Sequence, residues 1–326
     1  MALNRVAADG GGLRARATLV LIVNPGATRV DGSTVREVVR ALRQSWELEV
    51  RCTEGPGHAV ALARESARGG ADVVAALGGD GTVNEVANGL AGSETAMCCL
   101  SGGRTNSFAR TIGSPANPAR AAEALNSRRR VGVVDVGIVG GRRFLCVSAI
   151  GPLATASGDL SRRRRLAGSA AAGYFAAATL ATAAVEFLGG ATELRISANG
   201  QSLQAVAGVV QNAAPATWIG RRPLHVCDTA GLGSGTLAAA FLGRGVLRDL
   251  PSLTARAVWG RRGAVLCHPH VQAVPSTACL QVRSSSGEPF AVEADGELLG
   301  RFEEVEYQMR PAALRVLTGG ASEACF

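Results

Sequence analysis

The stretch Val-Val-Ala-Ala-Leu-Gly-Gly-Asp-Gly-Thr-Val-Asn-Glu-Val-Ala-Asn-Gly-Leu, residues 73–90, decides the fold predicted for this chain. Its apolar run, Val73 to Leu77, predicts a strand buried on both faces. A glycine turn follows, and Thr82 can then cap a helix with apolar positions at helical spacing. Unpaired N–H groups and the helix dipole at such a junction favour phosphate, so the stretch predicts an anion site. Because a carboxylate repels bare phosphate, Asp80 in the turn suggests that a metal ion or a hydroxyl is held as well.

The chain around this stretch alternates strands with helices. Further strands are expected at 19–23, 48–52 and 96–100, and helices at 35–42 (capped by Ser33 or Thr34), 58–67 and 118–125. This alternation predicts an α/β domain with a parallel sheet covered by helices on both faces. Ligands of such sheets bind beyond the carboxyl ends of the strands. We therefore expect Asn24–Thr28, Thr53 and Gly78–Thr82 to lie along one rim. The strand at 96–100 leads into residues 102–110, which repeat the pattern of glycines, a hydroxyl and a helix start.

Composition limits the chemistry available at this rim. The chain has 326 residues, enough for two domains, and a formal net charge of +8. All 34 of its positively charged Lys or Arg side chains are arginine, so any positive charge at a phosphate must come from arginine, metal or backbone. The eight cysteines show no paired spacing and predict buried thiols in a reducing cytoplasm. Residues 1–17 lack the apolar core of a secretory signal and are expected to be a disordered leader.

The second half of the chain changes to short strands with polar breaks, which predicts a second, β-rich antiparallel domain. The strands are expected at 131–139, 144–150, 194–198, 203–211, 237–242, 264–268, 278–283 and 305–309. The predicted division is 1–17 leader, 18–140 nucleotide-binding domain and 141–310 lipid-substrate domain, with the option that strand 311–318 returns to the first domain.

Several motifs resemble the diacylglycerol kinase catalytic-domain family, within the NAD kinase-like superfamily. They are Gly-Gly-Asp-Gly-Thr at 78–82 with Asn84-Glu85, the Gly103 to Arg110 loop, and the late Asp295-Gly296-Glu297 turn. A segment at 215–224 is similar to one in actinobacterial-type members.

The resemblance implies an ATP-dependent lipid kinase that uses Mg²⁺. Glu297 would be the general base, and Asp80 would act through magnesium. The implied nucleotide-binding residues are Asn24, Pro25, Gly26, Thr28, Thr53, Gly78, Gly79, Asp80, Gly81, Thr82, Asn84, Glu85, Gly103, Thr105 and Asn106. Diacylglycerol is the default substrate, and a sphingoid base or another long-chain alcohol remains an alternative.

The chain departs from the family where acids are usual. Ser107, Leu153 and the loop Leu232–Gly235 take those positions, which puts metal affinity and turnover in doubt. A catalytically weak relative that binds nucleotide or lipid as a regulator is therefore a second hypothesis. An NAD kinase is a third, and the Asn106–Arg110 segment and the Asp295–Glu297 turn speak against it.

The expected partner is a lipid at an anionic membrane surface, with no nucleic acid and with a homodimer left open. Four arginines, Arg162–Arg165, precede the Ala-rich stretch Leu166–Leu188. Two hypotheses remain open for them: a patch that binds anionic lipid headgroups, or a solvated helix end. A soluble helix is favoured over a membrane span for that stretch, so the protein is expected to be cytoplasmic and peripherally membrane-associated. No metal site made by protein side chains alone is expected. In Cys267-His268-Pro269-His270 the two histidines should point to opposite faces of a strand or turn.

Overall fold

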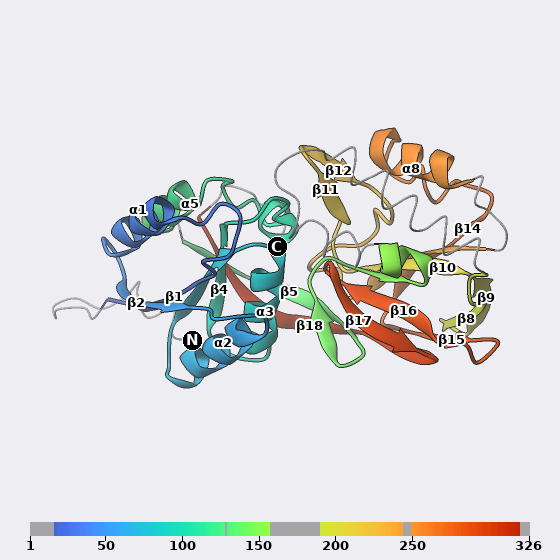
Figure 1. The fold of residues 1–326 in the computed structure, drawn as a ribbon, viewed down its shortest axis with the longest axis horizontal. Helices are drawn as coiled ribbons and strands as arrows, with labels where there is room; N and C mark the ends of the chain where they lie inside the picture. The colour runs from blue at the N-terminus through green and yellow to red at the C-terminus, as the bar shows by residue number, and fades with distance from the viewer. Residues whose placement is uncertain (1–15, 128, 157–189, 244–248, 320–326) are drawn as a thin grey trace. The chain divides into compact units, whose positions relative to one another are not determined.

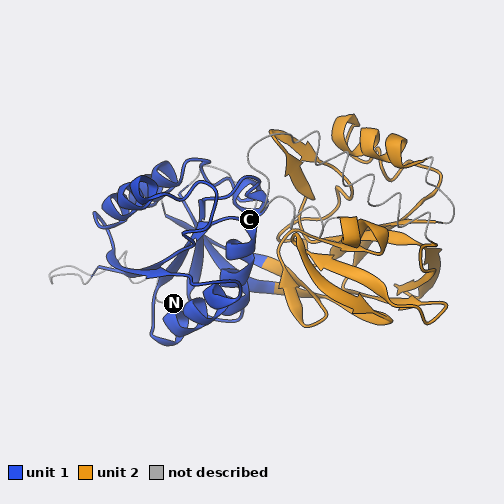
Figure 2. Ribbon diagram, viewed as in Figure 1, with its two compact units in different colours: residues 1–134, 312–326 blue, residues 135–311 orange. Residues whose placement is uncertain are grey.

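The computed structural model describes residues 16–127, 129–156, 190–243 and 249–319. These residues form two compact units, 1–134 with 312–326 and 135–311 (Figure 2). The expected leader up to residue 15, Arg162–Arg165 and the Ala-rich stretch lie outside the described residues.

Unit 1 is the predicted α/β domain, which confirms the fold class. Its parallel strands lie in the order β2 (Glu47–Cys52), β1 (Thr18–Val23), β3 (Val73–Gly78), β4 (Ala96–Ser101). The end of β18 (Glu304–Thr318) adds a fifth parallel strand beside β4. Every residue of β3 and β4 is buried, as the unbroken apolar runs predict.

Helices cover both faces of this sheet (Figure 1). The helices α1 (Gly32–Leu42) and α5 (Pro118–Ser127) pack on one face, and α2 (His58–Arg68) and α3 (Asp80–Leu90) on the other. The short helix α4 (Ser107–Thr111) follows β4.

Two predicted helix starts are wrong. The cap of α1 is Asp31, whose Oδ1 accepts hydrogen bonds from the Thr34 N–H (2.7 Å) and the Ser33 hydroxyl (2.6 Å). The helix after the glycine turn begins at Asp80 rather than after Thr82. In both cases a carboxylate lies at the positive end of a helix, where its charge is stabilising.

Unit 2 contains the predicted antiparallel sheets. One has the order β14 (Val271–Thr277), β13 (Leu237–Leu242), β10 (Ala207–Gln211), β7 (Val147–Ile150), β16 (Phe290–Ala294), β17 (Glu297–Phe302). In the other, the start of β18 pairs with β15 (Cys279–Ser284), followed by β8 (Leu194–Ala198) and β9 (Gln201–Ala205). β5 (Arg130–Val139) pairs with β18 and with β6 (Arg142–Phe144). One apolar core joins the two sheets and includes Phe144, Phe241, Phe290 and Tyr307.

Two smaller elements also belong to this unit. The hairpin of β11 (Thr217–Ile219) and β12 (Arg222–Leu224) contacts α8 (Leu250–Trp259). No helix among the described residues combines the length and the apolar content that crossing a bilayer requires.

Other details of the sequence prediction are wrong. Residues 264–268 form turns, and the strand expected at 203–211 is two strands that meet at Val206. Among the described cysteines, Cys98, Cys99, Cys146 and Cys227 are buried, but Cys52, Cys267 and Cys279 are exposed, so burial was predicted for too many.

Candidate active site

The glycine loops of unit 1 pack backbone against backbone at the carboxyl ends of β3 and β4. The Gly102 N–H donates to the Gly78 carbonyl at 2.8 Å. A Cβ atom on Gly103 would lie 2.6 Å from Gly79 Cα, and one on Gly78 would lie 2.5 Å from Thr82 Oγ1. Glycine is therefore required here because there is no room for a side chain.

The loop after β1 joins the same rim through Asn24. Its backbone N–H donates to the Leu77 carbonyl (2.9 Å), and its side-chain Nδ2 donates to Thr82 Oγ1 (2.9 Å). Its Oδ1 accepts from the Gly26 N–H at 3.0 Å. The Thr53 N–H, after β2, donates to the Val23 carbonyl at 2.9 Å. The structure thus brings together the loops that the sequence places on one rim.

Asp80 ties the two glycine loops to each other. Its carboxylate accepts hydrogen bonds from the backbone N–H of Asn106 (2.9 Å) and of Ser107 (2.5 Å). Asn106 itself closes the second loop, because its side chain accepts from the Gly103 N–H (2.9 Å) and donates to the Gly103 carbonyl (2.8 Å). Asp80 therefore has a positioning role at the start of α4 that the sequence did not reveal.

Glu85 and Asn84 also have structural partners. Glu85 accepts from the N–H groups of Gly57 (2.9 Å) and Ala59 (3.1 Å), so its carboxylate caps the start of α2. Asn84 is buried, and its carbonyl and Oδ1 accept from Asn88 Nδ2 at 2.9 and 3.0 Å. Glu85 thus ties α3 to the start of α2, whereas these contacts of Asn84 lie within α3.

Other predicted residues leave polar groups open at the rim. Pro25, Gly26, Thr28 and Gly81 are exposed, and a Cβ atom on Gly81 would meet nothing within 4 Å. Gly79 and Thr105 are partly exposed. No side chain covers the backbone at Gly81, so the first turn of α3 is accessible to an anion there.

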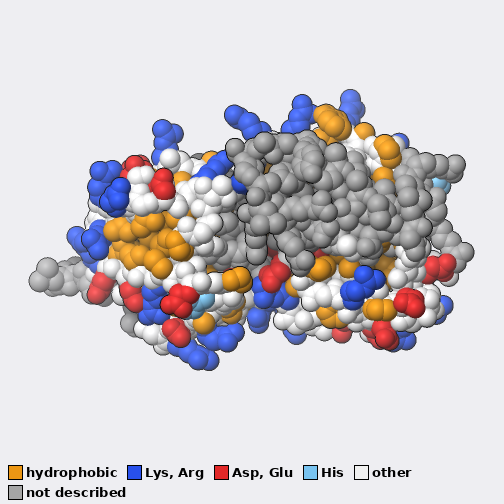
Figure 3. Space-filling model, viewed as in Figure 1, with side chains coloured by type: hydrophobic (Ala, Val, Ile, Leu, Met, Phe, Trp, Pro, Cys, Tyr) orange, Lys and Arg blue, Asp and Glu red, His pale blue; other side chains and the backbone are white. Residues whose placement is uncertain are grey.

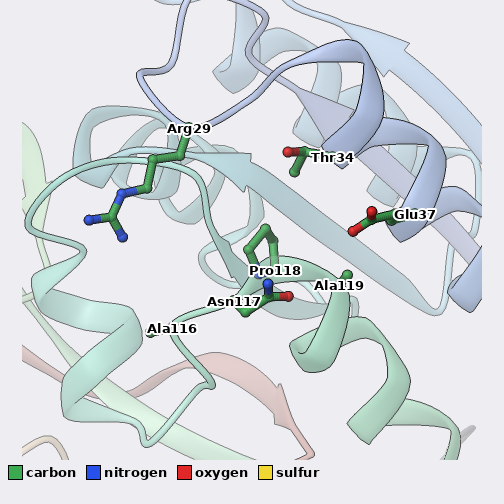
Figure 4. A pocket seen from close by; sticks show the side chains of 7 residues that line it. All are labelled: Arg29, Thr34, Glu37, Ala116, Asn117, Pro118 and Ala119. Carbon is green, nitrogen blue, oxygen red and sulfur yellow. The ribbon is translucent and has the colours of Figure 1, made fainter.

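A cavity of about 410 Å³ lies beside the loop after β1 (Figure 4). Thr34 and Glu37 line it from α1, Asn117 and Pro118 line it from the start of α5, and Arg29 adds a positive charge. Its lining includes none of the predicted nucleotide-binding residues. Arg29 connects it to the rim, because the Arg29 N–H donates to the Gly102 carbonyl at 2.9 Å.

In unit 2, Glu297 begins β17 directly after a tight turn. Asp295 (φ 47°) and Gly296 (φ 88°) make this turn, and both adopt the left-handed conformation that two-residue hairpins need. The Asp295 carboxylate accepts from the backbone N–H groups of residues 145, 146 and 147 at 2.6, 2.9 and 3.1 Å. Glu297 keeps 54% of its side chain exposed and pairs with Arg142 at 2.6 Å. A rigid turn thus presents an accessible carboxylate.

The positions without the family's acids are held by other contacts. Leu153 packs with Ala154 and Ala291 in a small apolar cluster. The loop at 232–235 is fixed by the buried Asp135, whose carboxylate accepts from the Gly235 N–H at 2.6 Å. The sequence prediction missed Asp135, although an acid between Val134 and Val136 in an apolar strand signals a buried carboxylate with a fixed partner.

Comparison with known proteins gives the class of unit 1. Residues 18–139 match the family described as "Diacylglycerol kinase catalytic domain". The resemblance drawn from the glycine loops is confirmed for this segment, which is similar to that family.

Individual proteins with similar sequences are named as kinases of the same kind. The Pseudomonas fluorescens protein named "Probable lipid kinase YegS-like" is 36% identical over 141 residues, which are 42% of this chain and 46% of that protein. The Bacillus subtilis protein named "Diacylglycerol kinase" is 32% identical over 146 residues, 43% of this chain and 48% of that protein. The matches thus span about half the length of these curated relatives. The crystal structure of a diacylglycerol kinase from Bacillus anthracis shares the fold, with a TM-score of 0.69 at 21% identity over 95% of this chain and 99% of that one.

Proposed function

We propose that this protein transfers the γ-phosphate of ATP to a lipid hydroxyl. The observation that carries the proposal is the rim of unit 1, where hydrogen bonds lock three loops together and the exposed Gly81 leaves the first turn of α3 accessible. Backbone N–H groups and a helix N-terminus suit phosphate, and phosphoryl transfer needs mainly positioning and charge stabilisation. The relatives named above are lipid and diacylglycerol kinases, which supports the same reaction.

Glu297 is the proposed general base. Its carboxylate is exposed and held by a rigid turn, so it can accept the proton of an incoming hydroxyl. Arg142 fixes the direction of the carboxylate through their 2.6 Å contact.

Magnesium is proposed to arrive with ATP, where it neutralises phosphate charge. Two of the predicted residues, Asp80 and Glu85, carry a carboxylate. Each oxygen of both carboxylates already accepts a backbone hydrogen bond. Mg²⁺ prefers six oxygen ligands and keeps several waters, so this rim is a poor cage for the bare ion. We therefore propose that Asp80 holds the loop after β4 in register through Asn106 and Ser107. This proposal replaces the role through magnesium that was expected from the sequence.

Diacylglycerol is the proposed lipid, because the B. subtilis relative is named for it. The test is transfer of labelled phosphate from ATP to separate anionic vesicles that contain diacylglycerol, a sphingoid base or a long-chain alcohol. Label on diacylglycerol supports the proposal, and label on another lipid alone changes the substrate but keeps the reaction.

A regulator that binds nucleotide without transfer is a second candidate. The apolar packing of Leu153, at a position where the family carries an acid, favours it. ATP binding with no labelled product across the whole panel would select this candidate and reject the kinase.

We also propose that the protein docks on anionic membranes through a surface of α8 and the β11–β12 hairpin. Trp259 is 66% exposed, and Arg221, Arg222, Arg261 and Arg262 are all exposed. Over α8, Figure 3 shows arginine side chains next to apolar ones. An aromatic side chain among arginines suits the headgroup region of an anionic bilayer.

A further inference from the structure

Three potential metal ligands meet in unit 2, at positions that the proposed reaction does not use. They are Asp249 before α8, His268 in the turn after it and His270 before β14. One ligand atom from each lies within 4.8 Å of the others. The sequence prediction that the two histidines point to opposite faces is therefore wrong.

The turn explains why these histidines converge. The His268 N–H donates to the Val265 carbonyl and the Val271 N–H donates to the His268 carbonyl, both at 3.0 Å. The backbone thus reverses around Pro269 instead of running on as a strand. The two imidazole rings lie 5.6 Å apart, centre to centre.

Hydrogen bonds leave His268 in a form that can bind a metal. Its Nδ1 is the acceptor of a long 3.3 Å contact from the His270 N–H, so that nitrogen carries a lone pair. Its Nε2 lies 3.2 Å from Ser252 Oγ and can donate its proton there. Histidines that bind metals commonly use one ring nitrogen in this way while the other N–H is held by a neighbour.

The remaining two ligands supply charge and access. His270 Nδ1 is in hydrogen-bond contact with Asp249 Oδ2, so the carboxylate already faces the ring. His268 is buried, the Asp249 side chain is 15% exposed and the His270 side chain is 40% exposed. The cluster is thus anchored on one side and open to solvent on the other.

We propose that Asp249, His268 and His270 bind a divalent transition metal of the zinc class. Two imidazoles and a carboxylate are ligands that Zn²⁺ takes, with solvent in the fourth position, whereas Mg²⁺ prefers oxygen alone. Bound metal would tie the start of α8 to the start of β14 and so stabilise the folded state. This site is separate from the ATP rim and does not depend on the proposed kinase reaction.

The test is Zn²⁺ titration of the full chain after removal of metal with EDTA. Because the eight cysteines can also take zinc, the diagnostic quantity is the difference between the wild type and His268→Gln, His270→Gln or Asp249→Asn. Each variant should lose one equivalent of bound zinc, or its zinc affinity should fall by at least ~10–100-fold. That is the loss seen when a residue that only hydrogen-bonds to a metal ligand is removed. The matched control is His225→Gln, which breaks another His–Asp pair (2.8 Å, with Asp228) and should bind like the wild type.

A second readout is the melting temperature, which needs no activity. Zn²⁺ should raise Tm in the wild type and in His225→Gln, and not in the three cluster variants. Equal zinc binding by the wild type and the cluster variants would overturn the proposal. A loss of zinc binding in His225→Gln as large as in the cluster variants would also overturn it. Displacement of zinc by an equal concentration of Mg²⁺ would overturn the class of metal.

Discussion

Glu297 is the residue on which the proposed chemistry depends most. Glu297→Gln keeps the size and much of the hydrogen bonding of the side chain but removes the base, so turnover should fall by about 10²–10⁴-fold. ATP binding should be retained. Phosphate transfer and ATP binding are measured for Glu297→Gln and for a control variant, Glu303→Gln. Glu303 is an exposed glutamate of the same unit. Near-normal turnover in Glu297→Gln with chemistry rate-limiting would contradict the assignment.

Asp80 can be tested as a positioning residue against a role as a metal ligand. Asp80→Ala leaves the buried Asn106 and Ser107 N–H groups without this acceptor, so we expect a loss of about 1–3 kcal/mol in the free energy of unfolding. ATP should bind more weakly because the second loop loses its register.

The control condition for Asp80→Ala is ATP binding with magnesium removed by EDTA. A positioning residue weakens binding with and without magnesium, and a metal ligand weakens it only with magnesium. A defect that disappears in EDTA, with stability unchanged, would restore the metal role.

At the scale of elements, the contact between the glycine loops depends on two glycines that differ in the space around them. Gly103→Ala would push a Cβ atom to 2.6 Å from Gly79 Cα, so it should destabilise the fold by about 1–3 kcal/mol and weaken ATP binding. Gly81→Ala meets open space and should fold normally. Urea unfolding measures the stability of the two variants, and ATP titration measures their affinity for ATP. A stable Gly103→Ala protein with normal ATP affinity would show that the loop contact is dispensable.

The sequence predicted the strands and loops of unit 1 well because local pattern determines them. The buried run at 73–77 and the turn that follows are visible without tertiary information. The partners of Asp80 were not predictable in this way, because Asn106 is 26 residues away and reaches Asp80 only through the pairing of β3 with β4. The apolar run within residues 264–268 was predicted to form a strand. In the structure these residues lie in turns between Gly263 and Pro269.

The histidine cluster was missed for the same reason. Asp249 lies 21 residues from its partner His270, and no periodic pattern links them. In unit 2 the alternation of short strands predicted the class of fold, whereas the break at Val206 depends on its N–H bond to the Leu242 carbonyl (2.9 Å).

At the scale of the whole molecule, the net charge of +8 and the α8 surface predict salt-sensitive membrane binding. Arg261→Gln with Arg262→Gln should weaken binding to anionic vesicles by more than about tenfold, since each arginine contributes about 1 kcal/mol at such a surface. Trp259→Ala should weaken it further. Arg195→Gln, an exposed arginine on β8, is the control. Vesicle sedimentation at rising salt measures the effect, and equal binding to neutral and anionic vesicles would contradict it.

We propose that this chain is a lipid kinase whose rim positions Mg-ATP mainly through its backbone. The most direct measurement is a magnesium titration of phosphate transfer from labelled ATP to diacylglycerol in anionic vesicles, with the unmodified protein. We expect saturable, magnesium-dependent transfer that is weak and needs about 10–100-fold more magnesium than relatives with the full set of acids, because outer carboxylates contribute about that factor. ATP binding without transfer at any magnesium concentration would contradict the claim.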